Sequence, residues 1–180
     1  MKKILMYGSN LERLNQFQQL CEEEGISFYP LNDQDLHLQL KVVFLKEEQG
    51  IGTSHQFSLE YLIVDGICEE DLLHFFERVK KTIGAYEGIT ITRTKINENW
   101  KLKDLFKETA LENEIMKKVM ELESMMREAN QLNLNQFPEE QRERVKNELM
   151  KSYLLLVQDN YEKEQVQQQV DNLKIALGRK

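Results

Sequence analysis

An unbroken apolar run, Tyr61 to Val64, ends abruptly at Asp65 and Gly66. The run is shorter than an average helix and turn residues bound it, which is typical of a strand that is covered on both faces. A strand of this kind needs a layer of structure on each side. We therefore predict that residues 61–66 form the central strand of a small α/β domain.

The residues before this run predict a β-α-β unit. Residues 3–7 form a buried strand, Ser9 or Asn10 caps a helix that reaches residue 24, and residues 26–29 form a strand that Pro30 ends. The crossover of such a unit is expected to be right-handed. The apolar residues in 33–46 fit both the alternation of a strand and the spacing of a helix, and we favour the helix. Residues 47–58 are expected to form a mobile polar loop.

The residues after the central run predict one more helix and one more strand. Leu72, Phe76, Val79 and Ile83 recur at helical spacing up to Gly84, and residues 89–94 alternate with β-branched side chains. The expected fold class is α/β, with a small four-stranded, mostly parallel sheet of order 2-1-3-4, flanking helices and a C-terminal helical hairpin. The domains are expected at residues 1–104 and 105–180.

Three segments of this first domain resemble a small bacterial family of unknown function. They are residues 3–8, residues 61–72 and the pattern Thr94-x-x-Asn97-x-x-Trp100-x-Leu102-x-x-Leu105. Over residues 1–115 the chain resembles the domain-of-unknown-function family numbered 3783, which implies a fold and no activity. Cys68 and Lys101 stand where that family tends to carry a helix-capping Ser and Thr. Asn99 is the expected cap for the second helix.

Turn residues at two strand ends form the candidate ligand site. Gly8, Ser9 and Asn10 follow the first strand, and Asp65 and Gly66 follow the central strand. If the strands are parallel, these ends meet at one edge, where open α/β sheets bind ligands. No catalytic residue, metal ligand or cofactor is predicted, because the two cysteines and three histidines form no recognisable motif. Trp100 is expected to plug against the sheet.

Apolar heptads dominate the C-terminal part. A helix to about residue 132 and a second, continuous helix over 139–177 are expected to form a hairpin whose longer helix extends past the shorter one. The residues by which the longer helix exceeds the shorter one must then pack on the α/β domain or on another chain. We favour a homodimer. The expected interface residues are Val119, Leu122, Met126, Leu149, Leu154, Leu156, Val166, Val170 and Leu173.

The net charge of −7 argues against nucleic acid or an anionic membrane as a direct partner. No apolar segment is long enough to span a bilayer, and the start does not resemble a signal peptide, so a cytoplasmic location is expected. The function expected first is that of a non-enzymatic interaction or scaffold protein that self-associates or binds a protein through its C-terminal helices. The alternative is a small-ligand or anion sensor, or an enzyme, that uses the strand ends.

Overall fold

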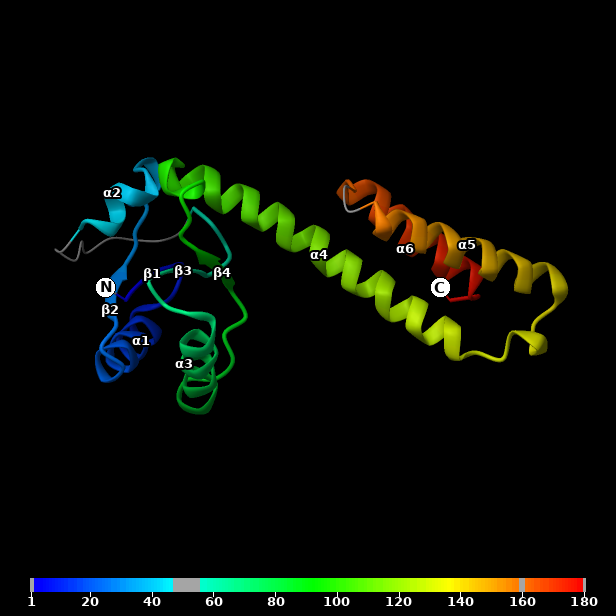
Figure 1. Ribbon diagram of the computed structural model, residues 1–180, viewed down its shortest axis with the longest axis horizontal. Coiled ribbons are helices and arrows are strands. Elements are labelled where there is room, and N and C mark those ends of the chain that lie inside the picture. The colour runs from blue at the N-terminus through cyan, green and yellow to red at the C-terminus, as the bar shows by residue number, and fades with distance from the viewer. Residues whose placement is uncertain (1, 47–55, 159–160, 180) are drawn as a thin grey trace. The chain divides into compact units, whose positions relative to one another are not determined.

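The computed structural model describes residues 2–46, 56–158 and 161–179 (Figure 1). The chain divides into an N-terminal unit, residues 1–110, and a C-terminal unit, residues 111–180. Helix α4, Leu102–Gln131, begins in the first unit and ends in the second. The mobile loop predicted at 47–58 lies largely outside the described residues.

The N-terminal unit is built on a four-stranded sheet, which confirms the α/β fold class. The strands are β1 (Lys3–Tyr7), β2 (Ser27–Pro30), β3 (Tyr61–Asp65) and β4 (Ile89–Thr92), in the predicted order β2-β1-β3-β4. The β1/β2 and β3/β4 pairs are parallel. The central β1/β3 pair is antiparallel, so the sheet is mixed, and the expectation that these two strands run parallel is wrong. That expectation treated the link from β2 to β3 as a further crossover, whereas the chain enters β3 from the opposite end.

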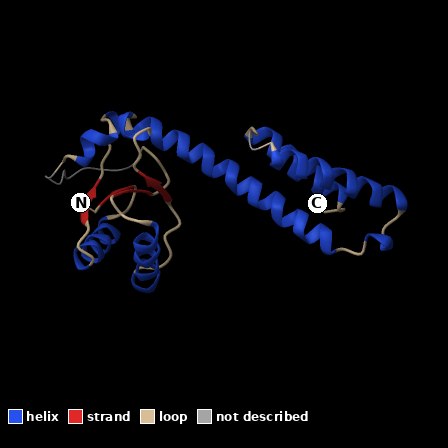
Figure 2. Ribbon diagram, viewed as in Figure 1, coloured by secondary structure: helices blue, strands red, loops and turns tan. Residues whose placement is uncertain are grey.

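Two layers of helices cover the sheet (Figure 2). Helices α1 (Leu11–Glu23) and α3 (Glu69–Thr82) pack on one face, where Phe17 and Phe75 meet the even-numbered side chains of the central strands. Helix α2 (Leu40–Phe44) and the start of α4 pack on the other face around Phe106. The segment 33–46 is helical as favoured, but in two pieces, because a short 3₁₀ turn, η1 (Asp35–His37), precedes α2.

The N-terminal unit contains two similar halves. Each half runs through strand, helix, strand, 3₁₀ turn and helix, the second turn being η2 (Asn97–Asn99). Leu5 pairs with Ile63 at the centre of β1/β3. The halves also exchange equivalent hydrogen bonds, since the Leu40 N–H donates to the Trp100 carbonyl (2.9 Å) and the Leu102 N–H donates to the Leu38 carbonyl (3.0 Å). The halves are therefore related by an approximate two-fold axis through the β1/β3 pair.

The same exchange of hydrogen bonds explains two wrong expectations. The Leu38 carbonyl, not Asn99, satisfies an N–H at the start of α4. The Asn99 side chain instead accepts a hydrogen bond from Lys41 Nζ (2.7 Å). The Trp100 side chain is 40% exposed and does not pack into the core of the sheet as expected. Its backbone carbonyl accepts the hydrogen bond from Leu40 instead. At α3, Cys68 makes no side-chain cap, and three acidic residues in the first turn stabilise the helix start instead.

The C-terminal unit is a bundle of three helices around one core. Its members are the later part of α4, α5 (Glu139–Val157) and α6 (Lys163–Ala176), with a 3₁₀ turn, η3 (Leu134–Gln136), before α5. The continuous helix predicted over 139–177 is therefore wrong. A capping arrangement begins α6, in which the Glu162 N–H donates to Gln165 Oε1 (2.9 Å). Helix α6 then folds back along α5, as Figure 1 shows.

Candidate functional site

The structure separates the two halves of the strand-end site. Gly8, Ser9 and Asn10 follow β1, whereas Asp65 pairs with Lys3 at the opposite end of that strand. Five strand residues at about 3.3 Å each place roughly 16 Å between the two groups. The five predicted residues therefore do not form one site, because the antiparallel pairing sends the carboxyl ends of β1 and β3 to opposite edges.

The residues at the end of β1 have structural roles. Ser9 Oγ donates a hydrogen bond to Glu60 Oε1 (2.5 Å), and Asn10 Oδ1 caps α1 by accepting from the Arg13 N–H (2.9 Å). Gly8 has φ +90°, and a Cβ there would lie 2.7 Å from the Leu59 carbonyl oxygen. Only glycine permits this conformation and this close approach. The turn is thus explained by backbone packing and by helix capping.

Asp65 at the other edge belongs to a chain of ion pairs. Its carboxylate accepts a hydrogen bond from Arg93 (2.9 Å), whose guanidinium also donates to Glu98 (2.9 Å). The same guanidinium lies 5.1 Å from the centre of the Phe44 ring, at a cation-π distance. Asp65 therefore has a structural partner, and Arg93 links the end of β3 to η2.

Several buried polar groups in the N-terminal unit carried no signal in the sequence. Tyr7 donates a short hydrogen bond to Asp33 Oδ1 (2.5 Å), and burial raises the pKa of Tyr7 to about 12. Lys3 Nζ donates to the carbonyls of Phe44 (2.7 Å) and Lys46 (2.8 Å). These bonds attach the segments that follow β2 to the sheet, and a strand pattern alone cannot foresee partners so distant in the chain.

Most of the predicted interface residues lie in the core of the C-terminal unit. Leu122 is fully buried there, together with Val166, Val170 and Leu173. Val119 is also buried, and Met126, Leu149 and Leu156 pack against the same core. Of the nine predicted residues, Leu154 alone is exposed. The heptad seams are therefore intramolecular, and α6 fills the place that the prediction gave to another chain.

A second apolar stripe on α5 faces away from this core. Met150, Tyr153, Leu154 and Val157 follow one another at steps of three, one and three, and they are 67%, 61%, 54% and 60% exposed. At 3.6 residues per turn these four side chains share one face, which we call the α5 stripe. The sequence showed that this part of α5 is apolar all round, but it could not show which face the other two helices cover.

Buried polar contacts fix the orientation of α5. Gln169 of α6 donates from Nε2 to Ser152 Oγ (3.0 Å), to the Glu148 carbonyl (3.1 Å) and to Glu148 Oε2 (3.1 Å). Ser152 is fully buried, and Gln169 is 8% exposed. Burial alone would raise the pKa of Glu148, but hydrogen bonds from Lys151 and Gln169 outweigh it and lower that pKa. Because polar partners in a core must stay paired, α5 cannot rotate and bury its stripe at little cost.

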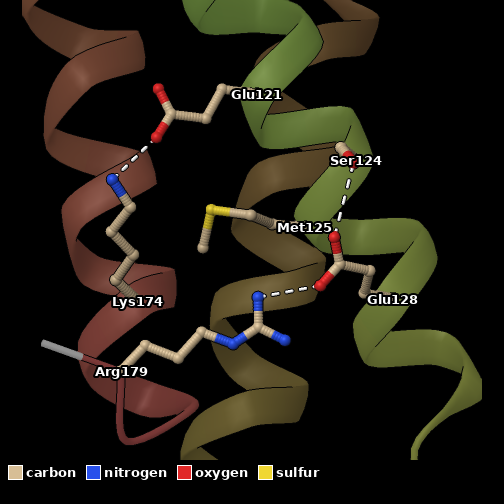
Figure 3. Close-up of a pocket in the computed structure, with 6 residues that line it drawn as sticks. All are labelled: Glu121, Ser124, Met125, Glu128, Lys174 and Arg179. Carbon is tan, nitrogen blue, oxygen red and sulfur yellow. Dashed lines mark hydrogen bonds and ion pairs between the residues drawn. The ribbon is translucent and has the colours of Figure 1, made fainter.

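A pocket of about 430 Å³ lies between α4 and α6 (Figure 3). Two ion pairs cross it, Lys174 with Glu121 (2.7 Å) and Arg179 with Glu128 (2.8 Å). The hydrogen bond from Lys174, followed by that from Lys118, lowers the pKa of Glu121. The charged groups of the pocket therefore satisfy one another, and they join α6 to α4.

No family model, curated protein or solved structure gives a significant match to the chain. Within residues 2–46, 56–158 and 161–179, no helix is both long enough and apolar enough to cross a membrane. The α5 stripe is thus the candidate functional surface that the geometry of the chain itself provides.

Proposed function

We propose that the chain is a non-enzymatic interaction or scaffold protein, in which the α5 stripe docks onto a protein chain. The observation that carries the proposal is the exposure of Met150, Tyr153, Leu154 and Val157 on a helix whose other face is already buried. A helix at the surface of a bundle ordinarily carries one apolar face and one polar face. The second apolar face costs solubility and adds nothing to the core of its own unit. A cytoplasmic location is part of this proposal.

The size of the α5 stripe supports a binding role. Its four side chains together expose roughly 450 Å², which lies within the range of the largest apolar patch on a typical monomer, a patch that is often functional. An amphipathic helix in a partner binds such a surface through residues at the same helical spacing. The stripe therefore fits a helical partner better than a small molecule, because its four uncharged side chains follow one exposed face of a helix and line neither of the pockets at Glu121 and at Pro138.

The resemblance of residues 1–115 to the domain-of-unknown-function family numbered 3783 stays a proposal. Its support is that the residues of the pattern all serve the same turn and helix start. The Thr94 N–H donates to Asn97 Oδ1 (2.8 Å), and Asn97 Nδ2 donates to the Thr92 carbonyl (2.9 Å). Leu102 and Leu105 enter the core of the sheet. The pattern thus specifies a fold and does not bring a second function.

Protection of a single cysteine tests whether another chain covers the α5 stripe. Leu154→Cys, made together with Cys68→Ser, places one exposed thiol on the stripe, since the remaining Cys21 is buried. We expect rapid reaction with a maleimide in dilute purified protein. We expect a severalfold slower reaction in concentrated protein or in an extract of the source cells.

Lys151→Cys is the matched control. Lys151 lies on the same turns of α5 but roughly 110° around the helix from the middle of the stripe, and its side chain is 62% exposed. Its reaction rate should be the same in all three conditions. If the thiol at position 154 reacts as fast in concentrated protein and in extract as in dilute protein, no chain covers the stripe and the proposed function is wrong.

A further inference from the structure

We infer that the chain which covers the α5 stripe is a second copy of this protein, with the two α5 helices antiparallel across a two-fold axis. The inference rests on the proposed function and names its partner. Two observations carry it: the order of large and small side chains along the stripe, and the distribution of charge on α5. The area that the stripe offers sets the strength of the dimer.

The side chains of the stripe complement a reversed copy of themselves. A two-fold axis between Tyr153 and Leu154 places Met150 against the partner's Val157 and Tyr153 against the partner's Leu154. Each layer then combines a longer side chain with a shorter one, so the layers have similar volume. A parallel pair would stack Tyr153 on the partner's Tyr153 and Val157 on the partner's Val157, which alternates crowded layers with loose ones.

The charges of α5 favour the same arrangement. Between Leu149 and Gln158, Lys151 is the one charged residue in the sequence, so two copies of this segment meet without strong repulsion. The same face of α5 continues toward its N-terminus through Lys146 and Glu143, both exposed. A parallel pair would bring each of these charges against its own copy, which destabilises helix pairs. An antiparallel pair points the charged halves away from each other.

The exposed area predicts a weak dimer. Two copies of the stripe supply roughly 900 Å² of buried surface, which is below the 1,200–2,000 Å² or so of stable complexes. The protein should therefore be monomeric at low micromolar concentration and form dimers at several hundred micromolar. The apolar character of the contact makes salt a minor influence on this equilibrium.

Sedimentation velocity on the full chain, from about 5 μM to about 500 μM, tests for the dimer. Leu154→Glu places two charges in the dimer contact and should raise the dissociation constant at least tenfold, whereas Lys151→Glu should leave it within about twofold. Circular dichroism shows whether each variant remains folded. A chain that stays monomeric up to about 500 μM, or a dimer that folded Leu154→Glu does not weaken, overturns the inference.

Disulfide formation tests the direction of the helices. In a Cys68→Ser background, Met150→Cys mixed with Val157→Cys should give a cross-linked dimer under mild oxidation. Met150→Cys alone should give little, because the two positions 150 lie far apart in an antiparallel pair. Cross-linking of Met150→Cys with itself, in preference to the mixture, would show a parallel pair and contradict the inference.

The two proposals fail in different ways. If the wild-type chain is monomeric at every concentration but the thiol at position 154 is protected in extract, another protein covers the stripe; the second-copy inference then fails and the proposed function stands. If that thiol is protected in neither condition, both fail. If it is protected in concentrated purified protein and the antiparallel cross-link forms, both are supported.

Discussion

Leu173→Ala tests whether the apolar residues of α6 belong to the core of the C-terminal unit or bind another chain. Leu173 is fully buried among the three helices of the C-terminal unit. Replacing a buried Leu by Ala removes its transfer free energy and leaves a cavity, at a cost of about 2–5 kcal/mol. For a unit of this size, each kcal/mol lowers the midpoint of thermal unfolding by about 4–8 °C, so we expect a decrease of at least about 8 °C.

Leu154→Ala is the matched control, because it makes the same chemical change at a site that is 54% exposed. Its cost should stay within about 0.5 kcal/mol, as for most surface substitutions. Differential scanning calorimetry of the full chain at low micromolar concentration measures both variants, and the transition of the N-terminal unit should not move in either.

The reasoning is refuted if Leu173→Ala leaves the midpoint within about 2 °C of the wild type but weakens self-association. That result would mean that residue 173 contacts another chain, as the sequence alone predicted, and that α6 does not fold back onto its own unit.

Three further predictions concern the polar contacts and the cysteines. Gln169→Ala leaves Ser152 and the Glu148 carbonyl buried with fewer partners, so we expect it to lower the free energy of unfolding by about 1–3 kcal/mol in urea titrations; an unchanged midpoint would contradict the buried contacts of Gln169. The folded-state pKa of Glu121 is lowered below its ordinary value of 4.5. The stability that Glu121 contributes is therefore complete above pH 4.5 and is lost as the pH falls through the folded-state pKa. Glu121→Gln should reduce the acid sensitivity of the C-terminal unit, whereas Glu123→Gln, at an exposed position, should not. Cys68 is exposed and should react with a thiol reagent at once, whereas Cys21 is buried with a pKa raised to about 12 and should react only when the N-terminal unit unfolds; two equally fast thiols in the native protein would contradict this.

Local patterns predicted the elements of the N-terminal unit well. The apolar run before Asp65 forms the central strand, Asn10 caps α1, and the order of the four strands is as expected. The direction of β3 relative to β1 was not predictable in this way. Both faces of these strands are covered, so parallel and antiparallel pairing give the same apolar run. The candidate ligand site required β1 and β3 to run parallel, so the antiparallel pairing rules it out.

The internal two-fold relation escaped the sequence for a different reason. The matching positions share roles more than residue types: Asn10 and Cys68 both occupy N-cap positions, and Gln39 pairs with its counterpart Lys101 in a β-bridge. A helix start needs a partner for its free N–H groups, but a backbone carbonyl from the other half can supply it. Residue identity is therefore not required to maintain the relation.

In the C-terminal unit, helical periodicity predicted the apolar faces of the helices but not what covers them. The seam of Val166, Val170 and Leu173 is real, but its partner is the rest of the same unit. The break between α5 and α6 decided this outcome. Its sequence signals were Asp159 and Asn160, which have low helix propensity, and the Glu162-x-x-Gln165 spacing of a helix start. Uninterrupted apolar spacing on both sides concealed these signals.

The relaxation of methionine methyl groups in the presence of a soluble nitroxide tests the central claim most directly. The chain has seven methionines, among which Met150 lies on the α5 stripe, Met120 is 60% exposed on α4, and Met125 is 5% exposed in the core. In dilute protein, we predict strong broadening of the Met150 and Met120 signals and none of Met125. In concentrated protein, Met150 should become protected while Met120 remains broadened. A Met150 signal that is protected at every dilution, or that follows Met120 at every concentration, would contradict the account.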